Sequence, residues 1–266
     1  MTTSYSVRGS GQTMIFFHNA GSNRDLWSRQ IDEFAKTYRT VAVDLPGYGA
    51  GEDLRGDATL DRYADFVEAL VSSVTDAPPI LVGHCIGAAM VLRATLRNPK
   101  RAKALVLFNV ATRAGIREGG YGALLRTLRR APWLVPIAAR VTELSPPAVR
   151  RASLKSQYLR TEDDPYLDEL VRLNGDRKHI DSLSALAPAM DTYGALEHFE
   201  KPTGFPSSLL LWGTKNRVLP LASSGAVRAS LRPDAWHEIV AGHLTMREAH
   251  EESNARMRAF LEAHAA

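Results

Sequence analysis

Short runs of apolar residues alternate with amphipathic segments along most of the chain. The apolar runs are rich in Val, Ile, Leu and Phe, which is typical of strands buried on both faces. Between them, apolar residues recur every three or four positions, as in amphipathic helices. Strands are predicted at Met14–Phe17, Thr40–Asp44, Pro79–Val82, Ala104–Phe108, Ser208–Trp212 and Trp236–Val240. Helices are predicted at Asn23–Tyr38, Thr59–Val74, from the Gly83–Gly87 turn to about Arg97, Leu221–Leu231 and Thr245–Ala263.

The alternation stops in the middle of the chain. From about Thr112 to Lys201, helical patterns are interrupted by prolines and no strand is convincing. Strands that alternate with helices imply an α/β fold with a mostly parallel sheet and helices on both faces. We therefore expect a core formed by residues 1–111 and 202–266, and a helical cap formed by residues 112–201.

The composition is that of a soluble globular protein with a sizeable core: 266 residues, of which 45% are hydrophobic and 23% charged. Its one cysteine cannot form an internal disulfide. Met1–Arg8 lacks the apolar core of a signal peptide, and no run approaches the roughly 18 apolar residues of a membrane span. We expect a cytoplasmic protein without a membrane partner, and find no signal for a cofactor or a metal.

The charge is uneven along the chain, although the net charge is only +4. Residues 113–160 contain ten Lys/Arg and two Asp/Glu. Residues 161–181 contain three Lys/Arg and seven Asp/Glu. The basic block could attract an acidic partner or a phosphate-bearing substrate, or it could be a solvated helical face. No zinc, recognition-helix or aromatic-interleaved basic motif is present, so a nucleic-acid partner is not expected.

The stretch Val82–Ala88, VGHCIGA, places the cysteine at the turn from a predicted strand into a helix. Gly-x-Cys-x-Gly matches the nucleophile elbow Gly-x-Ser-x-Gly, whose glycines allow a strained turn that lifts the nucleophile clear of the sheet. The helix N-terminus also favours a thiolate. A lone cysteine is more often a buried apolar filler, but within this pattern we predict that Cys85 is a nucleophile.

The other candidate site residues follow the ends of other predicted strands, where ligands bind in open α/β sheets. His243 follows the last strand, in VAGHL, and is the candidate general base. The oxyanion hole is expected to use the backbone N–H groups of Ile86, after the nucleophile, and of Ala20, in the loop after the first strand. Asn19 and His18 in that loop are candidates for substrate contacts or loop hydrogen bonds, unless the loop is an ordinary one.

Five stretches resemble landmarks of the α/β-hydrolase superfamily, in the family's order: FFHNAG, VAVDLPGYG, LVGHCIGAAMVL, LLLWGTKNRVLP and VAGH. The resemblance covers nearly the whole chain, with residues 112–200 as the variable cap. It implies the α/β-hydrolase fold with a nucleophile, a histidine and an acid, but it says little about the substrate.

The sequence departs from that superfamily at the nucleophile and at the acid. Cys85 replaces the usual Ser, and the two positions where members place the acid hold Asn216, in GTKNRVLP, and Asn109. A thiol is far more acidic than a hydroxyl, so its histidine needs orientation more than charge. An Asn carbonyl supplies that orientation in Cys-His-Asn papain-like proteases. We favour Asn109 over Asn216 as the residue that orients His243; alternatively, one or both only cap a turn.

Together these residues predict an enzyme that forms an acyl-Cys85 intermediate from an ester or thioester. Water would complete hydrolysis, an alcohol or amine would accept the acyl group, and a carbanion in the same substrate would close a ring with release. Superfamily members that resemble this chain at the elbow include dienelactone hydrolases and Dieckmann cyclases. The basic block would suit a small-molecule acyl substrate carried on an acidic carrier protein or on coenzyme A. A plain carboxylester or C–C hydrolase and a non-catalytic ligand receptor or scaffold are the alternatives; the oligomeric state is not indicated.

Overall fold

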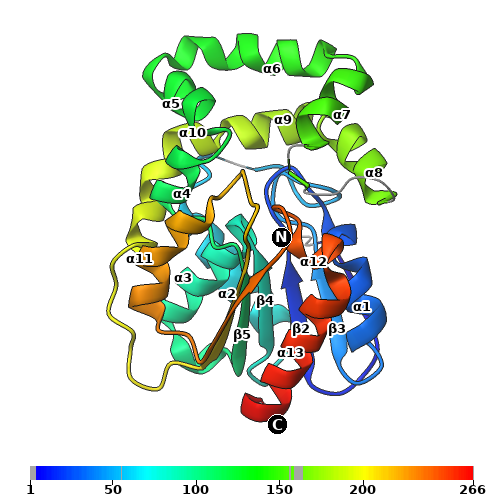
Figure 1. The fold of residues 1–266 in the computed structure, drawn as a ribbon, viewed down its shortest axis with the longest axis vertical. Helices are drawn as coiled ribbons and strands as arrows, with labels where there is room; N and C mark the ends of the chain where they lie inside the picture. Colours follow the sequence, from blue (N-terminus) through cyan, green and yellow to red (C-terminus); the bar gives the residue numbers. More distant parts are fainter. Residues whose placement is uncertain (1–3, 55, 156, 159–163, 266) are drawn as a thin grey trace.

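The computed structural model describes residues 4–265 with gaps at 55, 156 and 159–163. Its centre is a seven-stranded sheet in the order β1-β3-β2-β4-β5-β6-β7 (Figure 1). β1 pairs with β3 antiparallel, and all other neighbours pair parallel. The strands are β1 Tyr5–Arg8, β2 Thr13–Phe17, β3 Arg39–Val43, β4 Ile80–His84, β5 Ala104–Phe108, β6 Ser207–Gly213 and β7 Ala235–Ile239.

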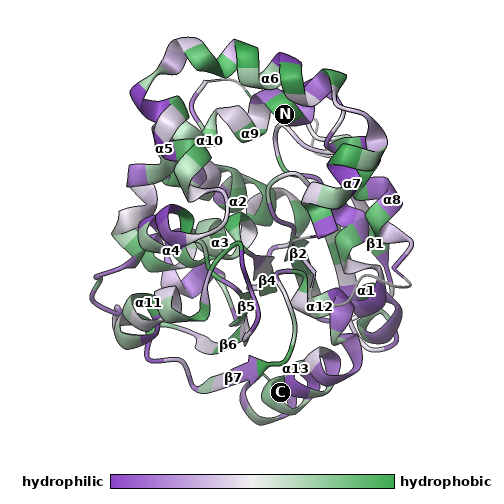
Figure 2. Cartoon of the chain, turned by 45° about the horizontal axis from the view of Figure 1, so that its top comes forward, coloured by the Kyte–Doolittle hydropathy of each residue, from purple (hydrophilic) through white to green (hydrophobic). Residues whose placement is uncertain are grey.

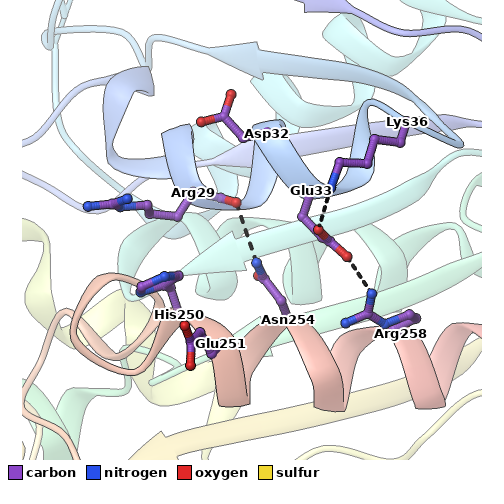
Figure 3. Close-up of a pocket in the computed structure, with 8 residues that line it drawn as sticks. All are labelled: Arg29, Asp32, Glu33, Lys36, His250, Glu251, Asn254 and Arg258. Carbon is purple, nitrogen blue, oxygen red and sulfur yellow. Dashed lines mark hydrogen bonds and ion pairs between the residues drawn. The ribbon is translucent and has the colours of Figure 1, made fainter.

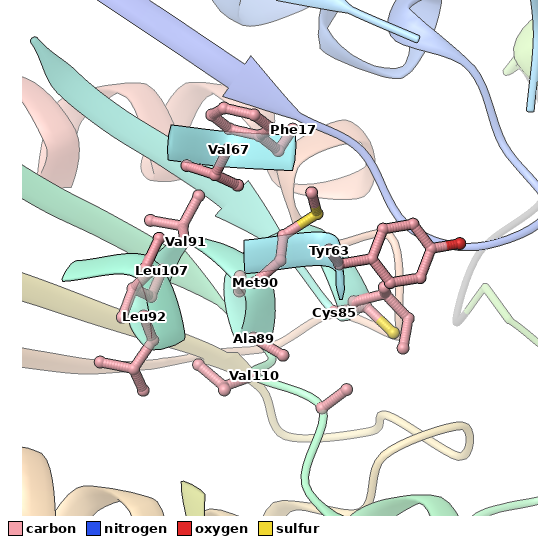
Figure 4. Packing of buried hydrophobic residues seen from close by; sticks show 14 of the residues in the cluster. Phe17, Tyr63, Val67, Cys85, Ala89, Met90, Val91, Leu92, Leu107 and Val110 are labelled. Carbon is pink, nitrogen blue, oxygen red and sulfur yellow. The ribbon is translucent and has the colours of Figure 1, made fainter. Parts of the chain in front are cut away.

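Helices cover both faces of this sheet, which explains why the central strands β2, β4 and β5 are buried along their whole length. In β2, Ile15 and Phe17 join the apolar cluster under one set of helices, and Met14 and Phe16 join the cluster under the other. Figure 4 shows part of the first cluster. The first set is α2 Leu60–Val74, α3 Ile86–Arg97 and α11 Ser224–Leu231, and the second includes α1 Ser28–Phe34 and α13 His250–His264.

The predicted core elements are confirmed, apart from one missed strand and differences at the ends of some helices. β1 was missed because it is a four-residue edge strand that is exposed along its length, so no apolar pattern marks it. The helix predicted at Asn23–Tyr38 begins as a 3₁₀ turn, η1 Arg24–Trp27, before α1. The last helix is interrupted at Ala249, which separates α12 Thr245–Glu248 from α13.

The cap lies between β5 and β6 and covers the carboxyl ends of the parallel strands (Figure 1). In it, α9 and α10 lie nearer the sheet, and α6 forms the outer edge. No helix in the described part of the chain is long and apolar enough to cross a membrane. The cap helices are α4 Arg113–Glu118, α5 Gly122–Arg130, α6 Val135–Leu144, α7 Pro147–Lys155, α8 Tyr166–Leu173, α9 Arg177–Ser184 and α10 Leu186–Ala189, followed by the 3₁₀ helix η4 Met190–Leu196.

A buried ion pair ties the cap to the core. The guanidinium of Arg247, in α12, donates to the two carboxylate oxygens of Asp164 at 2.6 and 2.7 Å and lies 4.5 Å from the ring centre of Tyr166. Burial acts to raise the pKa of Asp164, but the hydrogen bonds and charge of Arg247 lower it overall. The pair is therefore charged, and it fixes the start of α8 close to the loop that carries His243.

Candidate active site

Cys85 occupies a strained turn between β4 and α3. Its φ of 54° and ψ of −112° lie outside the regions that non-glycine residues ordinarily adopt. The flanking glycines make this turn possible: a Cβ at Gly83 would lie 2.6 Å from the backbone of Ala88, and one at Gly87 would lie 2.3 Å from the carbonyl oxygen of Phe17. The Gly-x-Cys-x-Gly pattern therefore meets a steric requirement of a real elbow.

The Cys85 thiol is protonated at neutral pH, which corrects the expectation of a resting thiolate. The residue is only 8% exposed, and burial raises the pKa of the thiol to about 12. The backbone N–H of Ile86, the first residue of α3, opposes this shift, but desolvation outweighs it. The helix N-terminus alone is therefore not enough to ionise a thiol that water does not reach.

His243 is held in the core beside the elbow by its backbone. Its N–H donates to the carbonyl of Gln157, in the cap, at 2.7 Å. Its carbonyl lies 3.0 Å from Nε2 of His84, and the two imidazole rings have centres 4.5 Å apart. Burial lowers the pKa of His243 to about 3, so the ring is neutral and can accept a proton during a reaction.

Asn109 supports the His243 loop rather than the His243 ring. Its amide donates to the carbonyl of His243 at 3.0 Å and to Oγ1 of Thr245 at 3.1 Å, while its Oδ1 accepts from the N–H of Gly213 at 3.0 Å. The expected bond from the imidazole to the Asn109 carbonyl is not formed, because that oxygen already serves the end of β6. Asn109 adopts a φ of 46°, which Asn tolerates better than most residues.

Asn216 also uses its oxygen on the backbone. Its Oδ1 accepts from the N–H groups of Val218 and Leu219, both at 2.9 Å, which fixes the amide and leaves Nδ2 buried without a partner. Nδ1 of His243 is likewise buried without a partner among the described residues. The expected carbonyl-to-imidazole bond is thus absent here too, and only the amide N–H of Asn216 is left to face another group.

The Ala20 N–H, the second expected oxyanion donor, lies in the loop after β2, and the hydrogen bonds of His18 fix this loop. Nε2 of His18 accepts from the N–H of Leu45 at 3.0 Å, so Nδ1 carries the proton and donates to the carbonyl of Asn19 at 2.7 Å. In a trans peptide the next N–H, that of Ala20, points the opposite way from this carbonyl. Oδ1 of Asn19 is buried and has no hydrogen-bond partner among the residues that the structure describes.

Three buried tyrosines near the thiol were not predicted as site residues. Burial raises the pKa of Tyr48 and Tyr193 well above the ordinary value, and the nearby Cys85 adds to both shifts. The hydroxyls of Tyr48 and Tyr63 lie near each other, but neither has a well-aligned hydrogen-bond partner in the described part of the chain. Figure 4 shows Tyr63 with Cys85 in the apolar cluster. Of the three, only Tyr48 carried a sequence signal, because it lies in LPGYG, directly after a predicted strand.

The pocket in Figure 3 is unrelated to this site. It has a volume of about 350 Å³ and lies between α1 and α13, on the other side of the sheet from α3. Its charged groups neutralise one another, since Glu33 pairs with both Lys36 and Arg258. Over the described residues, no group of three His, Cys, Asp or Glu side chains is placed to bind a metal.

The fold agrees with a comparison against known families. Residues 14–256 match the alpha/beta hydrolase family. The chain belongs to that family. The thermophilic esterase from Thermogutta terrifontis has the same fold, with a TM-score of 0.77 over 98% of this chain and 93% of the esterase, at 20% identity.

Curated relatives of this alpha/beta hydrolase are named as an acyltransferase component and as hydrolases. The chain is 25% identical over 97% of its length to the dihydrolipoyllysine-residue acetyltransferase component of the acetoin cleaving system of Cupriavidus necator, and it spans only 66% of that protein. It is 27% identical over 130 residues to the (E)-2-((N-methylformamido)methylene)succinate hydrolase of Acinetobacter baylyi, which is 49% of this chain and 48% of that enzyme.

Proposed function

We propose that this alpha/beta hydrolase is an acyl-processing enzyme that forms a covalent thioester on Cys85. The observation that carries the proposal is the strained Cys85 elbow, with φ 54° directly before the first residue of α3. Strained backbone at a residue with no packing need for it is a feature of functional sites, and a cysteine filling space in the core would not require it. The neutral His243 ring, whose centre lies 4.5 Å from that of His84, the residue before Cys85, supports the proposal.

In the proposed reaction, the thiol attacks the carbonyl carbon of an ester or thioester while His243 takes the thiol proton. The tetrahedral oxyanion accepts hydrogen bonds from the N–H groups of Ile86 and Ala20. The carbonyl re-forms, the bond to the leaving alcohol or thiol breaks, and His243 returns its proton to that leaving group. Sulfur and imidazole both begin neutral, so charge separates only in the transition state, where these donors stabilise it.

The second half of the proposed reaction depends on what attacks the acyl-Cys85. A thioester on Cys85 is about as reactive as an incoming thioester, which favours transfer or ring closure over simple hydrolysis. The buried site favours the same outcomes, since Cys85 is 8% and His243 1% exposed, which limits the entry of bulk water. A substrate carried on an acidic carrier protein or on coenzyme A stays part of this proposal.

The test is acyl loading, followed as an intact-mass shift with a series of acyl thioesters and activated esters. Wild-type protein is expected to gain one acyl group, and Cys85→Ala none. His243→Ala is expected to load much more slowly, because the variant lacks the proposed acceptor of the thiol proton. Equal loading of Cys85→Ala would refute the proposal. A Cys85→Ser variant that turns over as fast as wild type would instead favour a plain carboxylester or C–C hydrolase.

A ligand receptor or inactive scaffold on the same fold is the second candidate, and one observation favours it. The His243 ring has no carboxylate partner, and its Nδ1 has no partner of any kind in the described residues. The two functions are separated by the same series: a receptor would bind a thioester, seen by calorimetry, without any mass shift on Cys85.

A further inference from the structure

The outer side of the cap exposes bulky apolar side chains to solvent. Along α6, the buried position is taken by the small residue Ala139, at 2% exposure, while the larger apolar residues face outward. This is the reverse of what a surface helix of a globular protein shows. The outer apolar patch consists of Leu124 (52% exposed), Trp133 (69%), Ile137 (52%), Val141 (63%), Leu144 (65%) and Val149 (57%).

The patch is continuous along one helix face. Trp133 lies in the 3₁₀ turn Pro132–Leu134 directly before α6, and it is followed at spacings of four, four and three residues by Ile137, Val141 and Leu144. Such spacings place side chains on one side of a helix. Figure 1 shows α6 as the element farthest from the sheet, and Figure 2 shows hydrophobic turns along it next to hydrophilic turns of α5. The patch is therefore convex and outermost.

The cap that carries this patch has an excess of positive charge. Arg117, Arg130 and Lys155 are exposed, and none of them forms an ion pair with another described residue. Arg129 and Arg140 are exposed as well, although each pairs with a carboxylate. Residues 113–160 hold ten Lys/Arg against two Asp/Glu, of which Arg160 lies outside the described residues. An occupant of the patch must tolerate both apolar contact and this excess of positive charge.

We propose that the outer apolar patch docks on a lipid bilayer surface that contains anionic head groups. An exposed apolar helix face flanked by Arg and Lys is the pattern by which helices lie in a membrane interface, and Trp favours that depth. A second copy of this chain fits less well, because a two-fold contact would bring the same unpaired arginines together. A carrier protein would satisfy the charges, but it gives no reason for six protruding apolar side chains on a convex surface.

This inference departs from the expectation of no membrane partner. The sequence argument concerned only membrane-spanning segments, and no run is long enough for one. A surface-docked helix needs no such run, and the periodicity could not show which side of α6 faces the core. Docking would also hold the cap, which covers the site, against the source of acylated lipids or of other apolar substrates.

The experiment uses the whole chain in co-sedimentation with vesicles of phosphatidylcholine alone or with 30% phosphatidylglycerol. Wild type is expected to bind the mixed vesicles, to bind pure phosphatidylcholine far less, and to dissociate as salt rises. The double variant Ile137→Ser/Val141→Ser is expected to bind at least tenfold more weakly. Arg130→Gln/Lys155→Gln is expected to bind more weakly by roughly fivefold per charge. Val240→Ser is the matched control, since Val240 is 68% exposed but lies outside the cap.

Circular dichroism melts of each variant confirm that the exposed substitutions leave the fold intact. Binding that the Ile137→Ser/Val141→Ser variant retains in full would overturn the proposal, as would no vesicle binding at low salt. A wild type that self-associates in sedimentation, or that binds an acidic carrier protein while ignoring vesicles, would also overturn it. Acyl loading on Cys85 is not part of the readout, so the vesicle result is independent of the proposed function.

Discussion

The raised pKa of the Cys85 thiol leads to a quantitative prediction for the rate of thiol alkylation. The thiol pKa of about 12, against an ordinary value of 9.0, follows from burial. At pH 8 the thiolate fraction is then about one in 10⁴, rather than about one in ten for an unperturbed thiol. The difference of about three pKa units corresponds to about 4 kcal/mol against ionisation.

We therefore expect iodoacetamide to modify the native protein at least about 10³-fold more slowly at pH 8 than the urea-unfolded chain. The native rate is expected to rise about tenfold per pH unit from 7 to 10 without levelling off, while the unfolded rate levels off near pH 9. The assay is intact mass against time, and it reports one site because Cys85 is the only cysteine.

Fast alkylation of the native protein would refute this reasoning. Native alkylation at pH 7 that matches or exceeds the unfolded rate would show a thiolate stabilised by a protonated His243, as in papain-like sites. Alkylation of His243→Ala separates the two states. Its rate should equal that of wild type if the resting pair is neutral, and should fall sharply if an ion pair exists.

Three further predictions follow. Asn216→Asp keeps the oxygen that accepts from the backbone and adds an oxygen where Nδ2 lies, so the rate of acyl loading should rise roughly 100-fold. Asn109→Asp is the control and should not speed acyl loading, because the Asn109 amide already donates to two acceptors. Equal effects of the two substitutions would contradict this reasoning. Asp164→Asn leaves the Arg247 charge buried and should lower the free energy of unfolding by roughly 3–5 kcal/mol in urea titrations; an unchanged midpoint would contradict it. The buried histidines have pKa values depressed below 6.5, so the unfolded chain takes up protons that the native state excludes. The free energy of unfolding should fall by about 1.4 kcal/mol per pH unit for each of His18 and His243 as the pH is lowered from 6.5 towards 4. A free energy of unfolding that does not change over this pH range would contradict this.

The core elements and the elbow could be predicted from sequence because each rests on local constraints. Buried parallel strands need apolar runs, and the turn at Cys85 needs Gly83 and Gly87 for steric reasons alone. β1 could not be predicted, since an exposed edge strand has no apolar face to display.

The hydrogen-bond partners within the site could not be predicted. The loop position of Asn109 and Asn216 is visible in the sequence, but which side-chain atom meets which backbone group depends on how β6 and the His243 loop approach one another. The protonation of Cys85 depends on burial under the cap, whose packing has no sequence signature. The sequence therefore predicts the loops that carry the candidate residues, and not their hydrogen-bond partners or protonation states.

The hydrogen bond from the His243 N–H to the Gln157 carbonyl links two processes that are usually treated separately. Cys85 and His243 are covered, so a substrate enters only if the cap shifts. Gln157 belongs to the cap, and a shift there loosens its hold on the His243 backbone. Under the proposed function, substrate entry and the position of the His243 imidazole would then share one equilibrium, because both depend on where the cap segment that carries Gln157 lies. Affinity and turnover would therefore change together in variants of the cap.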